Sequence, residues 1–370
     1  MNPKPSPWLA LPIVAAAAFF APAPALAGAS AAAIAAGGLI PRQDSRIALA
    51  REVVHISDRK VVVEYDLRND TANDITTDLV FPVPSYQNEW DAMDPAAQAF
   101  RSLKIWADGE PVKYDADAKA DLNGIDITKT LEKAHIDVAT FGHLNLGRDQ
   151  HNAARKVFSA DYERLTPKQR HHLRDAGIFK GAEGYTLYTV HLEYHWAQKI
   201  PAHSTVHLRQ EYVPVVGFMQ QAPQADALQA ALMPAASPAG AAKPAAAQSG
   251  NDNPLSGFCA DTRLVHNLMA AQKIFAQSWG RSILPHWVDF NLLAEAGWHK
   301  PIEDFTLIID TPAPADDQQT LISFCSPGVV EKRDTDQPQV HLTNYTPGTD
   351  LHIGFFNAPT ELGGSPVAAK

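Results

Sequence analysis

One stretch of this chain, residues 61–84, constrains the fold more than any other: VVVEYDLRNDTANDITTDLVFPVP. Apolar and polar side chains alternate through its first part and again through its last part, with many β-branched and aromatic residues. A period of two with this composition predicts two strands. The polar run Asn69–Asp74 predicts the turn between them, and Pro82 and Pro84 predict the end of the second strand, because proline lacks a ladder donor. We therefore expect a central hairpin in a mainly β protein.

A second pair of strands is predicted within residues 185–213, separated by a loop that contains Pro201. Pairing the apolar face of one strand with that of the other sets a hairpin register, and opposite charges that face each other support it. The residues expected opposite each other are Trp196 and Val206, Tyr194 and Leu208, Glu193 and Arg209, His191 and Glu211, and His195 and His207.

Between these strand pairs, residues 115–180 are predicted to form a helical insertion. Thr128 can cap a short helix that runs through Ala134. A longer helix is expected over Pro167–Ala176, because a threonine cap followed by proline at the first helical position is a strong start signal and Gly177 is a typical stop. Just before the insertion, the pair Asp108-Gly109 predicts a tight hairpin.

The fold class expected from these patterns is an antiparallel β-sandwich-like unit followed by a smaller β-rich unit. The first unit spans 37–218 and includes the helical insertion. Residues 219–254 are rich in alanine and proline and are predicted to be a disordered linker. The second unit spans 255–357, with one helix capped by Asp261, and its strands could pack on the first unit to make one body. A flexible tail is expected at 358–370.

The first 27 residues have the pattern of a secretory signal peptide. Lys4 provides a short positive region, an apolar stretch follows, and Ala25-Leu26-Ala27 is an A-x-A cleavage site. The alternative is an uncleaved anchor, but the apolar stretch is short for a bilayer and is interrupted by Pro12. No later apolar run is long enough for a membrane-spanning helix. We expect a periplasmic or secreted protein that starts at Gly28.

The charge balance limits the classes of partner. The chain has a formal net charge of −10 at pH 7. Nucleic acids and anionic membranes both favour clustered lysine and arginine, so an acidic chain is a poor match for either. The partner that we expect is an unknown envelope protein or ligand.

The two cysteines, Cys259 and Cys325, both lie in the C-terminal part of the chain. In an oxidising compartment, an even pair is most simply explained as one disulfide, which would stabilise the fold by about 4–5 kcal/mol on a chain-entropy model. The alternative is two buried free thiols. The spacing is not C-x-x-C, so redox catalysis is not expected.

Histidines provide the candidate metal ligands. The segment His191-Leu192-Glu193-Tyr194-His195 has two histidines four apart, but the zinc motif H-E-x-x-H needs a helix and a glutamate beside the first histidine. The predicted register would add His207 to this face. Two facing histidines without a third ligand make a weak metal site, so an ordinary solvated sheet face is the preferred interpretation. No cofactor is expected.

Catalytic motifs are missing from the sequence. It contains no G-x-S-x-G elbow, no phosphate-binding loop and no dinucleotide fingerprint. A Ser/His/Asp triad joins residues that are distant in sequence, so this alternative stays open. We therefore predict no catalytic residues. The alternative functions are a hydrolase with an unrecognised site, which would need a pocket with converging polar groups, and a histidine-based metal-binding protein.

Short segments in a fixed order resemble a bacterial exported family known as domain of unknown function 4424. The matching segments are Gly37-Gly38-Leu39, Ile47 to Ser57, Val61–Asn69, Val80 to Pro84, Asn123 to Thr128, Leu165 to Gly177, Tyr212 to Gly217, Trp298 to Phe305, Ser323-Phe324-Cys325 and Tyr345 to Leu351. The chain departs from the family pattern at His299-Lys300 and in the inserted stretch 222–253. The resemblance implies no activity and no site residues. We expect an exported, non-enzymatic binding or structural module of the cell envelope.

Overall fold

The computed structural model describes the protein as a mainly β fold, which confirms the fold class. The described residues are 30–31, 36–41, 46–89, 102–136, 138, 163–180, 185–219, 228, 255–276, 283, 285–293, 298, 300–311, 318–332, 337–359 and 367–369. The predicted signal peptide lies outside them, as does the predicted linker apart from Met219 and Leu228. No helix in the described parts is both long enough and apolar enough to cross a membrane.

The first of three sheets has eight strands and joins the two predicted units. Its strands, in spatial order, are β18 (Glu331–Lys332), β19 (Pro338–Tyr345), β16 (Ile302–Ile309), β4 (Ile47–Ile56), β5 (Val61–Asn69), β13 (Ser204–Tyr212), β7 (Lys104–Ala107) and β8 (Glu110–Pro111). Strands β4 and β16 pair in parallel, with Val54 opposite Leu307. The strands on either side of residues 219–254 therefore share one hydrogen-bonded sheet, which is the continuous arrangement that the sequence left open.

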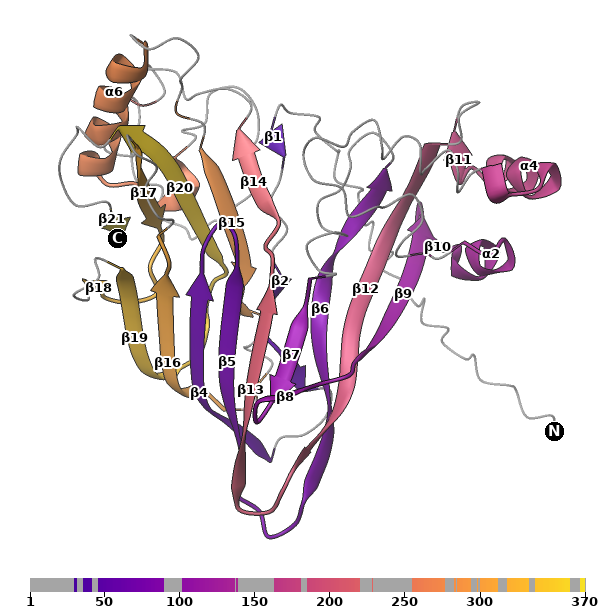
Figure 1. Ribbon diagram of the computed structural model, residues 1–370, viewed down its shortest axis with the longest axis horizontal. Helices are drawn as coiled ribbons and strands as arrows, with labels where there is room; N and C mark the ends of the chain where they lie inside the picture. The colour runs from indigo at the N-terminus through magenta and orange to yellow at the C-terminus, as the bar shows by residue number, and fades with distance from the viewer. Residues whose placement is uncertain are drawn as a thin grey trace, which may run out of the picture.

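The second sheet has six strands and faces the first across the core (Figure 1). It consists of β10 (Ile125–Asp126), β9 (Asp115–Leu122), β12 (Tyr185–Ile200), β6 (Ile75–Glu89) and β3 (Ile40–Pro41), with β11 (Phe179–Lys180) paired to β12. The expected central hairpin is wrong, because β5 belongs to the first sheet and β6 to the second. Pro82 and Pro84 also do not end the strand, since β6 continues to Glu89.

The predicted register between β12 and β13 is wrong for the same reason. Strand β12 pairs with β6 and β9, whereas β13 pairs with β5 and β7. Trp196 therefore lies opposite Leu79, and Val206 lies opposite Leu67. Alternation shows which face of a strand is apolar, but not which strand is its neighbour. The apolar face points into the core both when the next strand pairs with it and when the next strand lies in the opposing sheet.

Two arches cross between these sheets at the same end of the molecule, one from β5 to β6 and one from β12 to β13 (Figure 1). The fully buried Asn69 links them. Its side-chain nitrogen lies 2.9–3.0 Å from the carbonyl oxygens of Asn73, Ile200 and Pro201, and its side-chain oxygen accepts hydrogen bonds from the backbone and hydroxyl of Thr71. One amide thus fixes the path of both arches.

The third sheet closes one end of the core. Its path is β1 (Ser30–Ala31), β14 (Val216–Met219), β15 (His286–Asn291), β20 (Leu351–Pro359), β17 (Gln318–Phe324) and β21 (Val367–Ala369), and β2 (Ala36–Gly37) pairs with β15. Strand β21 pairs in parallel with β17, so this part of the predicted flexible tail is a strand.

A helix covers the outer face of the third sheet and forms a second, smaller core there (Figure 1). This helix, α6 (Thr262–Ala276), starts at the predicted cap, where the Asp261 carboxylate accepts a hydrogen bond from the backbone of Leu264 at 2.7 Å. A short 3₁₀ turn, η2 (Ser256–Phe258), precedes it. The predicted disulfide joins Cys259, just after this turn, to Cys325 at the end of β17.

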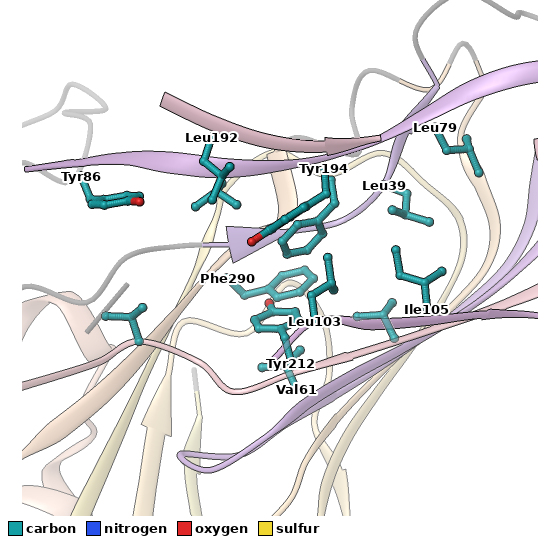
Figure 2. Packing of buried hydrophobic residues seen from close by; sticks show 14 of the residues in the cluster. Leu39, Val61, Leu79, Tyr86, Leu103, Ile105, Leu192, Tyr194, Tyr212 and Phe290 are labelled. Atoms are coloured by element: carbon teal, nitrogen blue, oxygen red, sulfur yellow. The ribbon is translucent and has the colours of Figure 1, made fainter. Parts of the chain in front are cut away.

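All three sheets contribute to the main core, and Leu39, from the described residues 36–41, is part of it. Figure 2 shows Tyr194 of β12 and Tyr212 of β13 on opposite sides, with Leu39 and Phe290 between the two layers. Leu39 is fully buried, and its carbonyl oxygen accepts a hydrogen bond of 3.1 Å from the Trp298 indole. The segment that contains Leu39 is therefore a structural part of the fold.

Among the described residues of the helical insertion, α2 (Thr128–Lys133) and α4 (Pro167–Asp175) lie at the far edge of the second sheet (Figure 1). Thr166 caps α4 as predicted, in a reciprocal capping box with Gln169. Thr128 does not cap α2, because its hydroxyl accepts a hydrogen bond from the Ala120 backbone of β9 instead.

Candidate functional site

A groove of about 480 Å³ lies on the outer face of the eight-stranded sheet. We call it the Trp106 groove, and it is lined by Arg51, Glu64, Asp66, Trp106, Gly109, His207, Leu208 and Arg209. These residues come from β4, β5, β13 and the β7–β8 hairpin, which are neighbours in the sheet. It is the feature of the described residues that best fits a binding site.

Strand alternation explains why the polar side chains gather there. Tyr65 and Leu67 of β5 are fully buried, so Glu64 and Asp66 point to the opposite, outer face. In the sheet register, Arg51 lies opposite Asp66, and Arg209 lies opposite Glu64. An acidic strand is thus placed between two strands that carry basic residues.

The β7–β8 hairpin supplies the wall of the groove. Asp108 and Gly109 adopt φ angles of 49° and 85°, which confirms the tight turn predicted from this dipeptide. The Asp108 carboxylate accepts a hydrogen bond of 2.9 Å from the His207 backbone and so fixes the turn to β13. The turn holds Trp106 beside β13, where the Arg209 guanidinium lies 4.9 Å from the centre of the indole ring.

The charges inside the groove are paired with unequal strength. The His207 ring nitrogen lies 2.7 Å from an Asp66 oxygen, and Arg209 donates to Glu211 at 2.9 Å. In contrast, the closest nitrogen–oxygen distance between Arg51 and Glu64 is 3.8 Å, which is too long for a hydrogen bond. Arg51 and Glu64 are also more than 40% exposed, at 44% and 43%. Both groups can therefore form hydrogen bonds to a ligand.

The histidines considered as metal ligands are not brought together. His207 lies on the eight-stranded sheet, while His191 and His195 lie on β12 of the six-stranded sheet. His191 contacts the Ser85 hydroxyl at 2.7 Å, and a nitrogen of His195 lies 3.3 Å from an Asp117 oxygen. Across the described residues, no group of three or more histidine, cysteine or carboxylate side chains is arranged to hold a metal ion.

The Trp106 groove could not be identified from the sequence. Glu64, Asp66 and Arg209 were visible as the polar positions of alternating strands, but such positions normally indicate only a solvated face. Trp106 carried no signal, because its strand is short. The sequence does show acidic residues on one strand and basic residues on two others. These residues form a site only because β13 pairs with β5, and the sequence did not predict that pairing.

A second charged cluster lies on the same sheet, near the arches. Arg68 of β5 reaches past β4 to make two hydrogen bonds, of 2.6 and 2.7 Å, to the carboxylate of Glu303, and it also bonds Asp70 at 2.7 Å. The hydrogen bonds from Arg68 hold the pKa of Glu303 and that of Asp70 below their usual values. The residue opposite Arg68 on β4 is the small Ala48, so the guanidinium can cross this strand.

This cluster predicts a pH-dependent stability. A carboxylate whose pKa is lowered in the folded state stabilises the fold at pH values above its usual pKa, which is 4.5 for Glu303. This contribution is lost as the pH falls through the folded-state pKa. We expect Arg68→Gln to lower the free energy of unfolding near neutral pH by about 0.5–1 kcal/mol, since the pair is partly exposed. The difference should shrink in acid. Urea unfolding at several pH values checks this, and a difference that does not change with pH would contradict it.

Comparisons with known proteins identify the chain only at the level of a family. Residues 27–353 match the model of a family described as a domain of unknown function, DUF4424. No curated protein matches significantly. Six chains of known structure match, one of them a "putative nutrient binding protein" of Legionella pneumophila. That match has 11% identity and a TM-score of 0.40, over 89% of this chain and 72% of the other, which is too low to support an inference about this chain.

Proposed function

Because this chain belongs to the DUF4424 family, whose description names no activity, we propose a function from the structure: an exported, non-enzymatic binding protein whose ligand site is the Trp106 groove. The observation that carries this proposal is the groove itself, in which an aromatic wall adjoins charged side chains that still have hydrogen-bonding capacity. An aromatic surface combined with a few directed polar groups is typical of ligand sites.

Binding fits the side chains of the groove better than hydrolysis does. The His207–Asp66 pair has the geometry of a base and its orienting carboxylate. However, the described residues that line the groove include no serine, threonine or cysteine that could act as the nucleophile. The proposed role is therefore recognition.

Two features support export. The sequence begins with a stretch that has the pattern of a signal peptide, with Ala27 as the last residue before the cleavage site. Cys259 and Cys325 form a disulfide, a bond that persists mainly in oxidising compartments such as the periplasm or the cell exterior. The disulfide closes a loop with a sequence separation of 66, which corresponds to a stabilisation of about 4 kcal/mol on the chain-entropy model.

A thermal-shift screen tests the proposal. Protein from the periplasmic or secreted fraction is heated with amino acids, short peptides, nucleotides and saccharides. We expect at least one class to raise the Tm of the wild type, and Arg51→Gln should remove most of this increase because it removes a guanidinium donor. The matched control is Arg59→Gln, which removes an exposed arginine from the β4–β5 turn, outside the groove.

Two results would contradict this function. A ligand that raises the Tm of Arg51→Gln as much as that of the wild type would place the binding site elsewhere. A chain found only in the cytoplasm with residues 1–27 still attached would contradict export. Circular dichroism of each variant shows whether a lost response reflects lost binding or lost folding.

A further inference from the structure

The charges of the Trp106 groove give information about the charge of its ligand. Its two guanidinium groups, Arg51 and Arg209, are balanced by the carboxylates of Glu64 and Asp66. Because the acidic residues lie on β5, between the strands that carry the two arginines, the signs alternate across the sheet. An anionic ligand would meet carboxylates and a cationic ligand would meet guanidinium groups. A ligand without net charge avoids both of these like-charge repulsions.

The distance between Arg51 and Glu64 favours a ligand that carries hydroxyl groups. The guanidinium offers only donors and the carboxylate only acceptors, and their closest atoms are 3.8 Å apart. A hydroxyl group is both donor and acceptor, so one ligand hydroxyl can accept from Arg51 and donate to Glu64 at normal hydrogen-bond distances. A carboxylate or an ammonium ligand could satisfy only one of the two.

The wall of the groove suits a ring with an apolar face. The Trp106 indole is held in place by the β7–β8 turn and by the guanidinium of Arg209, and it is partly exposed. A rigid indole surface that adjoins fixed polar groups can contact the C–H face of a sugar ring, while the hydroxyl groups of that ring reach the neighbouring charged side chains. An aliphatic chain could also contact the Trp106 indole, but it would leave the charged side chains of the groove without hydrogen-bond partners.

The open form of the groove indicates an extended ligand. The His207 side chain is 67% exposed, and those of Arg51 and Glu64 are 44% and 43% exposed. Sites for small molecules typically bury roughly 70–90% of the ligand surface, which this shallow face does not allow. A polymer that continues across the sheet can add contacts along its length and does not need to be enclosed.

From these observations we infer that the ligand of the Trp106 groove is an uncharged polysaccharide chain, an inference that rests on the proposed binding function. One sugar ring lies against Trp106, and its hydroxyl groups bridge Arg51 and Glu64. The neighbouring rings extend along the outer face of the eight-stranded sheet.

An array of immobilised polysaccharides tests the ligand class. It contains neutral glucans, mannans and galactans, and acidic polysaccharides as comparison. We expect the wild type to bind a neutral polysaccharide, with an affinity that changes little between low and high salt. Glu64→Gln should weaken this binding about tenfold or more, because a hydrogen bond to a charged acceptor is replaced by a weaker one. The matched control Glu132→Gln makes the same change at an exposed residue of α2, outside the eight-stranded sheet, and should bind like the wild type.

The outcomes separate this inference from the proposed function. If only charged ligands bind, and Arg51→Gln or Glu64→Gln abolishes that binding, the groove is a binding site but the ligand class is wrong. If no ligand of the array or of the thermal-shift screen depends on the groove, both proposals fail. An assay for new reducing ends accompanies the binding measurement, and their release by the wild type would replace recognition with hydrolysis as the function.

Discussion

Replacing Gly37 by alanine should destabilise the protein by about 3 kcal/mol or more and should lower its yield of folded protein. Gly37 is buried in β2, in register with Asn291 of β15. A β-carbon at this position would overlap the carbonyl oxygen of Asn291 and would lie 2.7 Å from the Asn291 β-carbon. These atoms belong to or adjoin the backbone of a paired strand, so they cannot move aside without breaking the sheet.

The measurement for Gly37→Ala is the free energy of unfolding in urea. Gly348→Ala is the matched control, because a β-carbon at residue 348 would have no heavy atom within 4 Å. We expect the control to unfold near the wild-type midpoint. If both variants unfold together, the N-terminal segment does not pass between the sheets as described.

The second large effect is expected for Asn69→Ala. The alanine would remove the hydrogen bonds to the buried carbonyl of Ile200 and to the partly buried carbonyls of Pro201 and Asn73, so both arches would lose this partner. Each buried group that loses its partner costs about 1–3 kcal/mol, so we expect a loss of about 3 kcal/mol in the free energy of unfolding. Asn69→Asp should not restore stability, since a carboxylate cannot donate to these carbonyls.

Asn73→Ala is the matched control for Asn69. Residue 73 lies in the same arch, is exposed, and contributes its backbone carbonyl, which alanine retains. Urea unfolding should therefore leave Asn73→Ala close to the wild type. A loss of equal size in the two variants would show that the composition of the arch, and not the amide of residue 69, determines stability.

The local structure of this chain was largely predictable, whereas the pairing of its strands was not. The cap and stop of α4 at Thr166 and Gly177, the start of α6 at Asp261 and the turn at Asp108-Gly109 depend on a few adjacent residues, and all are confirmed. Such signals act through short-range hydrogen bonds and allowed φ angles, so the sequence records them directly.

Strand pairing depends on contacts between distant segments. The alternation in β5 and β6 is the same for a hairpin and for an arch, because both arrangements bury the same side chains. The difference lies in Asn69, whose buried amide joins the two arches. From sequence alone, this residue looks like one more polar member of a turn.

The candidate site was unpredictable for the same physical reason. The Trp106 groove needs β13 between β5 and β7, and the sequence favoured β12 as the neighbour of β13. The incorrect register also placed His207 opposite His195, whereas these residues lie on different sheets. In contrast, the Cys259–Cys325 pair could be predicted, because a chain with two cysteines allows only one intramolecular disulfide.

The parallel pairing of β4 with β16 also determines when the protein can finish folding. His55, at the end of β4, and Asp310, just after β16, are neighbours at 3.4 Å although 255 positions separate them in the chain. During synthesis, β4 therefore keeps one edge open until nearly the whole chain has emerged, and contacts between such distant segments form slowly. A fragment that ends before β16 would expose that edge of β4 to other chains and would be prone to aggregate.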